Sequence, residues 1–199
     1  MGNTNDIRVI RTKRLLMNAF AELLEEKDFA EISVKDIVEK AEVARTTFYR
    51  NYLDKEDFVE KIKKELLEGV FIACEKERMP DRLTSEKYYQ KFFEYFYKNR
   101  IFFNSFINSG KWSEFSEDFF EQGVAAYQEM IGEYNLNEGI PGDILIHYII
   151  AAHTGVVQYW LKKNCPYSVE DMAKILTRIT VDGPLKIAGL RAAQLKLPK

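Results

Sequence analysis

Six of the seven residues at positions 45–51 carry side chains that donate or accept hydrogen bonds, and none of the seven is acidic. The six are Arg45, Thr46, Thr47, Tyr49, Arg50 and Asn51. Proteins bind the phosphates and base edges of nucleic acids with guanidinium, hydroxyl and amide groups of this kind. The run therefore predicts a nucleic-acid contact, although the solvated face of an ordinary helical bundle has a similar composition.

The charge distribution favours a local attraction to phosphate. The chain has 29 Lys and Arg residues against 31 Asp and Glu residues, so its formal net charge is −2 and it is not a polycation. Residues 8–14 nevertheless contain four basic residues and no acid, and residues 43–55 contain three basic residues and one acid, Asp54. Positive charge gathered in two segments is what docking to a phosphate backbone requires.

A helix-turn-helix is the element that we expect to position these side chains. Its first helix is predicted at residues 34–41, its connection at 42–44 and its second helix at 45–51. The second helix has one large apolar residue, Phe48, which would anchor it while the polar side chains point outward.

The apolar spacing is helical along almost the whole chain, and no run alternates over the length of a strand. Ser33, three residues before Asp36, predicts an N-terminal cap. Pro184 is expected to kink or split the last helix, because it cannot donate to the helix ladder. The predicted fold is all-α with about nine helices. Their expected ranges are 7–26, 34–41, 45–51, 55–78, 85–98, 100–108, 113–134, 142–163 and 169–195.

The aromatic residues are unevenly distributed. More than half of them lie between Tyr88 and Phe120, whereas the first 55 residues contain few. We therefore expect a small helix-turn-helix domain at residues 1–54 and a larger C-terminal helical bundle at residues 55–199.

Enzymatic and metal chemistry have no support in the sequence. Two cysteines, Cys74 and Cys165, and two histidines cannot build a disulfide framework and offer little for a zinc site. There is no Ser-His-Asp order with supporting glycines and no phosphate-binding glycine loop. We expect no enzyme activity, no metal and no cofactor.

Two observations concern the location of the chain. Its first fourteen residues lack the apolar core of a secretory signal, so a cytoplasmic location is expected. Residues 144–161 are nearly apolar and just reach the length of a membrane span. Because His147, His153 and Gln158 interrupt this stretch, we interpret it as a core helix, with no membrane association.

Three short motifs follow one another near the N-terminus: ISVKDI at residues 32–37, VARTTFYRNY at 43–52 and LDKED at 53–57. In this order they resemble the N-terminal domain of TetR-type bacterial transcriptional repressors, and the resemblance covers residues 11–62. The remainder is similar to the family in size, helicity and order of helices. Within it, residues 92–106 (FFEYFYKNRIFFNSF) are like the C-terminal region of one branch of the family.

The resemblance implies roles for single residues. Ser33, Lys55 and the hydroxyl of Tyr49 would contact backbone phosphates, and Arg45 and Thr46 would face base edges. Arg45 would bridge O6 and N7 of a guanine, which is worth ~1–3 kcal/mol of discrimination, and Thr46 would meet a thymine methyl.

Four further positions complete this comparison. Thr47 and Arg50 are each expected to contact either a backbone phosphate or a base. Ala44 stands where a Ser or Thr cap is common in the family, so the second helix lacks that cap. Asn51 stands where a His is frequent, which keeps a donor and removes a titratable charge.

TetR-type proteins work as dimers that pair their last two long helices. Here this implies a homodimer through residues 142–163 and 169–195, and the apolar breadth of 144–161 supports it. Two recognition helices about one turn of DNA apart, ~34–36 Å, would then read a near-palindromic operator of double-stranded DNA.

Members of the family also bind a small molecule in a pocket beside the fourth helix, which changes the spacing of the DNA-binding heads. Aromatic residues at helical spacing would converge inside the bundle and predict an unidentified small apolar or aromatic effector. A filled core is the alternative interpretation of the same residues. The candidate pocket residues are Phe92, Phe96, Phe103, Phe106, Trp112, Phe115, Phe119, Tyr127 and His147.

The expected function is a sequence-specific DNA-binding transcriptional regulator, a repressor that its ligand releases. The alternative is a ligand-binding or protein-binding helical module, or a transcriptional activator, whose helix-turn-helix does not repress.

Overall fold

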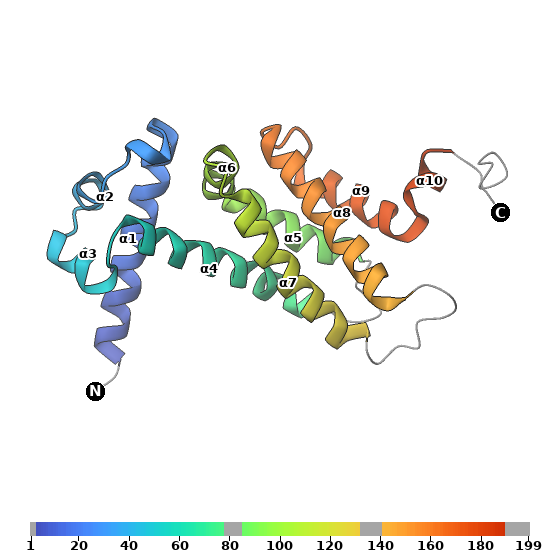
Figure 1. The fold of residues 1–199 in the computed structure, drawn as a ribbon, viewed down its shortest axis with the longest axis horizontal. Coiled ribbons are helices and arrows are strands. Elements are labelled where there is room, and N and C mark those ends of the chain that lie inside the picture. Colours follow the sequence, from blue (N-terminus) through green and yellow to red (C-terminus); the bar gives the residue numbers. More distant parts are fainter. Residues whose placement is uncertain (1–2, 78–84, 132–140, 190–199) are drawn as a thin grey trace. The chain divides into compact units, whose positions relative to one another are not determined.

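The computed structural model describes residues 3–77, 85–131 and 141–189, and every regular element within these ranges is a helix (Figure 1). The predicted all-α class is confirmed. The elements are α1 (Asn3–Glu26), η1 (Phe29–Glu31), α2 (Val34–Lys40), α3 (Arg45–Asn51), α4 (Lys55–Cys74), η2 (Glu75–Glu77), α5 (Glu86–Lys98), α6 (Arg100–Asn108), α7 (Trp112–Ile131), α8 (Gly142–Lys162), α9 (Val169–Asp182) and α10 (Pro184–Ile187). Parts of three predicted helices, at 78, 132–134 and 190–195, lie outside the described residues.

The predicted break in the last helix is present. α9 ends at Asp182, Gly183 has a φ of 80°, and Pro184 begins α10. A positive φ is readily adopted by glycine, and proline is tolerated at the first position of a helix. The Gly-Pro pair therefore ends one helix and begins the next.

The chain divides into two compact units. The first comprises Met1–Glu68 and Asn99–Phe115, and the second comprises Gly69–Lys98 and Ser116–Lys199. α6 thus belongs to the same unit as the N-terminal helices, and α4 contributes residues to both units. The expected boundary between a DNA-binding domain at residues 1–54 and a C-terminal domain at residues 55–199 stays a prediction.

Aromatic rings hold the first unit together. The ring centroid of Phe58 lies 5.5 Å from Phe20, 5.5 Å from Phe48 and 4.8 Å from Tyr52, all in edge-to-face geometry. Phe102 of α6 lies 6.2 Å from Phe20. Such pairs contribute beyond the area that they bury, so α3 is fixed on α1 and α4 by rings that are themselves out of solvent.

The second unit is built around α5, which packs along α9 and also contacts α8. Phe93 of α5 meets the edge of the Trp160 indole of α8, with a centroid distance of 5.2 Å. The Trp160 Nε1–H donates to the carbonyl of Tyr167 at 3.0 Å, so this buried indole keeps a hydrogen bond.

A directional chain of hydrogen bonds crosses the interior of the second unit. The Thr180 hydroxyl donates to the carbonyl of Leu176 at 2.8 Å, so its oxygen accepts from Tyr89 Oη at 3.0 Å. The single Tyr89 proton is then used, and His153 Nε2–H donates to Tyr89 Oη at 3.2 Å. This chain requires a proton on Nε2 of His153. Burial lowers the pKa of His153 to about 4, so at neutral pH the ring is uncharged and is the Nε2–H tautomer.

Acidification from pH 7.5 to 5 is expected to destabilise the second unit through His153. Its folded pKa of about 4 lies below the ordinary histidine value near 6.5, so in this window the unfolded chain binds a proton that the folded chain does not. The free energy of unfolding therefore falls as the pH falls, by about 2 kcal/mol at pH 5. Urea unfolding at both pH values measures the loss.

His153→Gln should lose this part of the pH dependence, and His147→Gln, at the exposed second histidine, is the matched control. An unchanged pH dependence in the His153 variant would contradict the assignment.

α8 is the one helix in the described ranges that is long and apolar enough to cross a membrane. One face of it is buried in the second unit, through Ile146, Ile150, His153, Val157, Trp160 and Leu161. A helix whose buried face includes a hydrogen-bonded histidine and tryptophan is typical of a protein core.

Candidate nucleic-acid interface

The N-terminus of α2 is fixed by a reciprocal cap, as the sequence predicts. The Asp36 amide donates to Ser33 Oγ at 3.2 Å, and the Ser33 amide donates to the Asp36 carboxylate at 2.8 Å. The Ser33 hydroxyl donates to the same carboxylate at 2.7 Å, and Lys27 Nζ lies 3.1 Å from it. These bonds lower the pKa of Asp36 to about 2, and the bond from the Ser33 hydroxyl has the largest effect. The Asp36 carboxylate is therefore charged at neutral pH and the reciprocal cap is complete.

The turn between α2 and α3 is compact. Glu42 has a φ of 53°, and the Val43 amide donates to the carbonyl of Val38 at 3.0 Å. α3 starts after Ala44, which makes no side-chain cap, so the Thr47 amide donates to the Ala44 carbonyl at 2.8 Å within the first turn. The helix-turn-helix predicted from the spacing is therefore present.

α3 is held by one side and exposes the other. Phe48 is fully buried and Tyr52, just after the helix, is nearly so. Of the polar residues on α3, four are exposed and two, Thr47 and Asn51, are half-buried. The exposed four are Arg45, Thr46, Tyr49 and Arg50.

Arg45 and Tyr49 lie one turn apart and contact each other. Arg45 Nη2 donates to Tyr49 Oη at 3.4 Å, and its guanidinium carbon lies 5.5 Å from the centroid of the Tyr49 ring. A guanidinium stacked on an exposed ring retains free N–H groups at its edge. This pair therefore presents an oriented donor at the start of α3.

The end of α3 is closed by side chains. Asn51 Nδ2 donates to the carbonyl of Thr47 at 2.7 Å, so the amide donor expected to face outward is used within the helix. Lys61 Nζ donates to the carbonyl of Asn51 at 3.0 Å and to Asp57 at 2.8 Å. The Lys61 contribution was not anticipated from the sequence, where only its spacing of four from Asp57 indicates an ion pair.

Lys55 is oriented toward η1. Its Nζ donates to the carbonyl of Phe29 at 3.2 Å and lies 4.5 Å from the centroid of the Phe29 ring. Contact with a phosphate would require this ammonium to share or exchange that bond. Ser33 is likewise committed to its cap, although its position at the N-terminus of α2 keeps it exposed.

The electrostatics of the first unit match the distribution seen in the sequence. In the described part of the chain, no carboxylate forms an ion pair with any of the exposed arginines of α1 and α3. These arginines are Arg8, Arg11, Arg14, Arg45 and Arg50. The cations nearer the acidic residues are neutralised, as Lys13 is by Glu65 and Lys27 by Asp36. Unpaired guanidinium groups therefore provide the net attraction for an anionic polymer.

The candidate effector residues fall into both units. Phe103, Phe106, Trp112 and Phe115 are buried in the first unit, where the Phe103 and Phe115 centroids are 5.2 Å apart. Phe92, Phe96 and Phe119 are buried in the second, where Phe92 and Phe96 are 5.0 Å apart. Two candidate residues remain, one histidine and one tyrosine.

His147 is exposed on α8, with Nδ1 2.7 Å from the carbonyl of Asp143 and its ring 5.0 Å from Phe120. Tyr127 lies in α7, and its side chain is outside the described part of the structure. A cavity of about 370 Å³ in the first unit lies between the ends of α1 and α6, and no candidate residue lines it.

Among the described residues, no three His, Cys, Asp or Glu side chains lie close enough together to hold a metal ion. Cys74 is buried, and burial raises the pKa of its thiol to about 12. A thiol of this kind is protonated and unreactive at neutral pH.

A capped first helix, a tight turn and an acid-free second helix on an all-α scaffold form a helix-turn-helix, the unit with which many transcriptional regulators bind DNA. Residues 16–62 match the family model of bacterial regulatory proteins of the tetR family, and residues 84–182 match the model of the transcriptional regulator C-terminal region, TetR_C_8. Together these models cover most of the chain. The chain belongs to the TetR family of bacterial transcriptional regulators.

Individual relatives agree with this assignment. The chain is 29% identical over 164 residues to the uncharacterized HTH-type transcriptional regulator YxbF of Bacillus subtilis (strain 168), covering 78% of the chain and 41% of that relative. It thus spans less than half of the length of that protein.

Two solved structures share the fold. One is a TetR transcriptional regulator from Streptococcus agalactiae 2603V, 26% identical, with a TM-score of 0.61 and coverage of 90% of this chain and 98% of that one. The other is the dihydroxyacetone kinase operon activator DhaS, 17% identical, with a TM-score of 0.66 and coverage of 91% and 98%.

Proposed function

We propose that this chain binds a near-palindromic DNA operator as a homodimer and represses transcription until a small apolar or aromatic effector releases it. The observation that carries the DNA-binding part is the face of α3. Four exposed polar side chains without any acid are held outward there by a fully buried Phe48. Cytoplasmic location follows from this function, because the operator is there.

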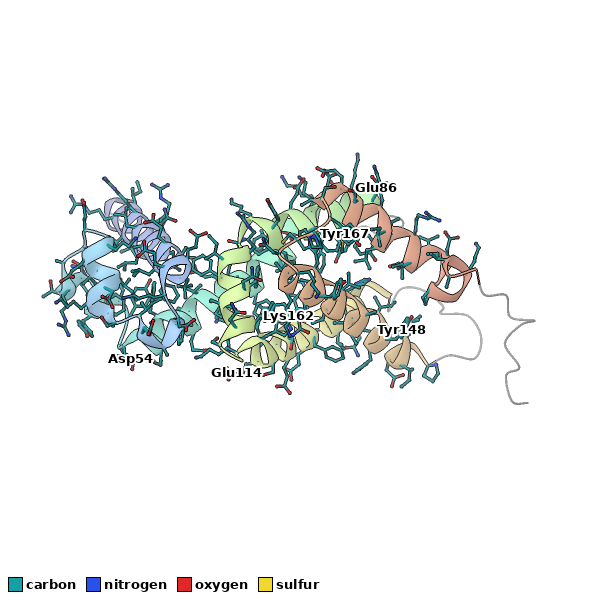
Figure 2. All side chains as sticks on the ribbon, turned by 90° about the horizontal axis from the view of Figure 1, so that it is seen from above. Asp54, Glu86, Glu114, Tyr148, Lys162 and Tyr167 are labelled. Atoms are coloured by element: carbon teal, nitrogen blue, oxygen red, sulfur yellow. The ribbon has the colours of Figure 1, made fainter. Side chains whose placement is uncertain are left out.

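The homodimer is supported by the outer face of α8. Exposed residues recur at steps of three and four along it, so they form one stripe on the side away from the unit's core. The stripe comprises Ile144, Tyr148, Ala151, Ala152, Gly155 and Tyr159, and Tyr148 is labelled on α8 in Figure 2. Exposed Ile175 and Val181 of α9 add to the apolar surface. A self-complementary surface of this kind suits a two-fold dimer.

Effector release is supported by the chemistry of the second unit. Its described interior is aromatic and contains the chain of hydrogen bonds through Tyr89, which is buried and whose hydroxyl pKa is raised by burial to about 12. Such an interior suits an apolar or aromatic molecule with few polar groups. No cofactor is part of this proposal.

Activation of transcription is the alternative to repression. A solved structure with the same fold is named as an operon activator, so the fold is compatible with activation as well as repression. We favour repression because a small molecule that changes the spacing of two DNA-binding heads most directly weakens operator binding.

Selection of bound sequences from random duplex DNA tests the central proposal. We expect a two-fold-symmetric consensus with half-sites about 10 base pairs apart, because each recognition helix reads one major-groove face. Affinity for the selected duplex should fall steeply as salt rises. A pool without a consensus, or affinity that barely changes with salt, would instead favour a protein-binding helical module.

A further inference from the structure

The first turns of α1 form a surface outside the matched DNA-binding segment. α1 begins at Asn3, whereas the family model begins at residue 16. At 1.5 Å per residue, residues 3–15 extend the helix by about 20 Å. In Figure 1 this part of α1 projects past α3.

One side of these turns carries both arginine and isoleucine side chains. At 100° per residue, positions 7, 10, 11 and 14 share the side opposite Leu16 and Phe20, which are buried in the core. Ile7 is 62% exposed and Ile10 is 60% exposed. We define the arm surface as Ile7, Ile10, Arg11 and Arg14 on this side, together with Arg8 on its flank next to Arg11, all of them exposed.

The charges of the arm surface are available to a partner. In the described part of the structure, none of its three arginines forms an ion pair with a carboxylate, whereas the adjacent Lys13 pairs with Glu65 of α4. Guanidinium groups that are exposed and unpaired attract anions without first breaking a bond within the protein.

We propose that the arm surface binds the DNA backbone beside the segment that α3 reads, so that each subunit contacts more DNA than its half-site. This inference rests on the proposed DNA-binding function. A duplex that lies against α3 continues past the projecting turns, where Arg8, Arg11 and Arg14 bind its phosphates. Ile7 and Ile10 then contact the apolar edges of the deoxyriboses.

The test compares the full-length chain with an R8Q/R11Q/R14Q variant on two duplexes, the selected operator alone and the operator with ten added base pairs on each side. The parent is expected to bind the long duplex more tightly than the short one, and the variant to bind both equally. The slope of log affinity against log salt should become shallower by about 0.9 per lost phosphate contact, or about 5 in a dimer that loses six.

A K64Q/K91Q/K186Q variant is the matched control, because it also removes three exposed positive charges, each of which has a carboxylate partner. It should keep the salt slope and the preference for the long duplex. The consensus from random DNA should be the same for all three proteins, because α3 is unchanged.

Two results would overturn the inference while leaving the proposed function intact. One is a parent that binds a symmetric consensus with equal affinity on both duplexes. The other is an arginine variant whose affinity for DNA depends on salt as the parent's does, but which no longer binds vesicles of phosphatidylglycerol that the parent binds. That result would assign the arm surface to a membrane. If the parent selects no consensus, the proposed function itself fails.

Discussion

Arg45→Ala is expected to lower the affinity for the selected operator by about 2–6 kcal/mol and to relax the preference at one base pair in each half-site. A bidentate arginine–guanine contact is worth ~1–3 kcal/mol, and a symmetric dimer makes it twice. The structure supports this role because Arg45 is exposed at the first position of α3 and has no carboxylate partner among the described residues.

Tyr49→Phe is the informative companion variant. Tyr49 Oη accepts from Arg45 at 3.4 Å, so removing the hydroxyl takes away one restraint on the guanidinium and, in the proposed complex, a contact to phosphate. We expect weaker binding to all sequences, with the consensus retained. The double variant should lose less than the sum of the two single losses, because residues in contact are coupled.

Lys186→Gln, which removes an exposed charge on α10, is the control for Arg45→Ala. Competition between the operator and single-base variants of it, at one fixed salt concentration, measures both affinity and preference. An Arg45 variant with the parent's affinity and consensus would show that this side chain does not read the operator.

Gly155→Glu is expected to convert the proposed dimer to a monomer and to lower operator affinity by about 10²- to 10⁴-fold, since the two heads would no longer be linked. A Cβ placed at Gly155 meets no atom within 4 Å, so a side chain is accommodated within the subunit. In a two-fold dimer that pairs α8 with its copy, the same side chain would place two carboxylates in an apolar contact.

Gly155→Ala is the matched control for the dimer. Both substitutions replace a glycine within a helix, which by itself favours the helix by up to about 1 kcal/mol. The alanine variant should therefore remain a dimer with at least the parent's stability. Sedimentation equilibrium gives the mass of each variant, and circular dichroism shows whether the helix content is kept. A glutamate variant that stays dimeric would exclude this face of α8 from the interface.

Much of the fold was predictable because its signals are local. The helix ranges follow from apolar residues spaced three and four apart, and the Ser33–Asp36 cap and the break at Gly183–Pro184 follow from residues close together in the chain. The helix-turn-helix and the outward position of Arg45 follow from the same patterns, since Phe48 is the one large apolar residue of α3.

Other features depend on residues far apart in the sequence. The list of candidate effector residues did not anticipate that Phe103 and Phe115 would pack in one compact unit and Phe92 and Phe96 in the other. Helical spacing identifies the side of a helix that is buried, but it does not identify the helix against which that side packs.

The sequence by itself determined the class of fold, the helix-turn-helix and the gathering of arginines near the N-terminus. Only the tertiary structure decided the partners of long or buried polar side chains. Lys55 bonds to Phe29, 26 residues away, and Tyr89 accepts from His153, 64 residues away. The physical reason is that helix formation is governed by neighbours within one turn, whereas a buried hydrogen bond needs a partner that only the packing of separate helices brings within 3 Å or so.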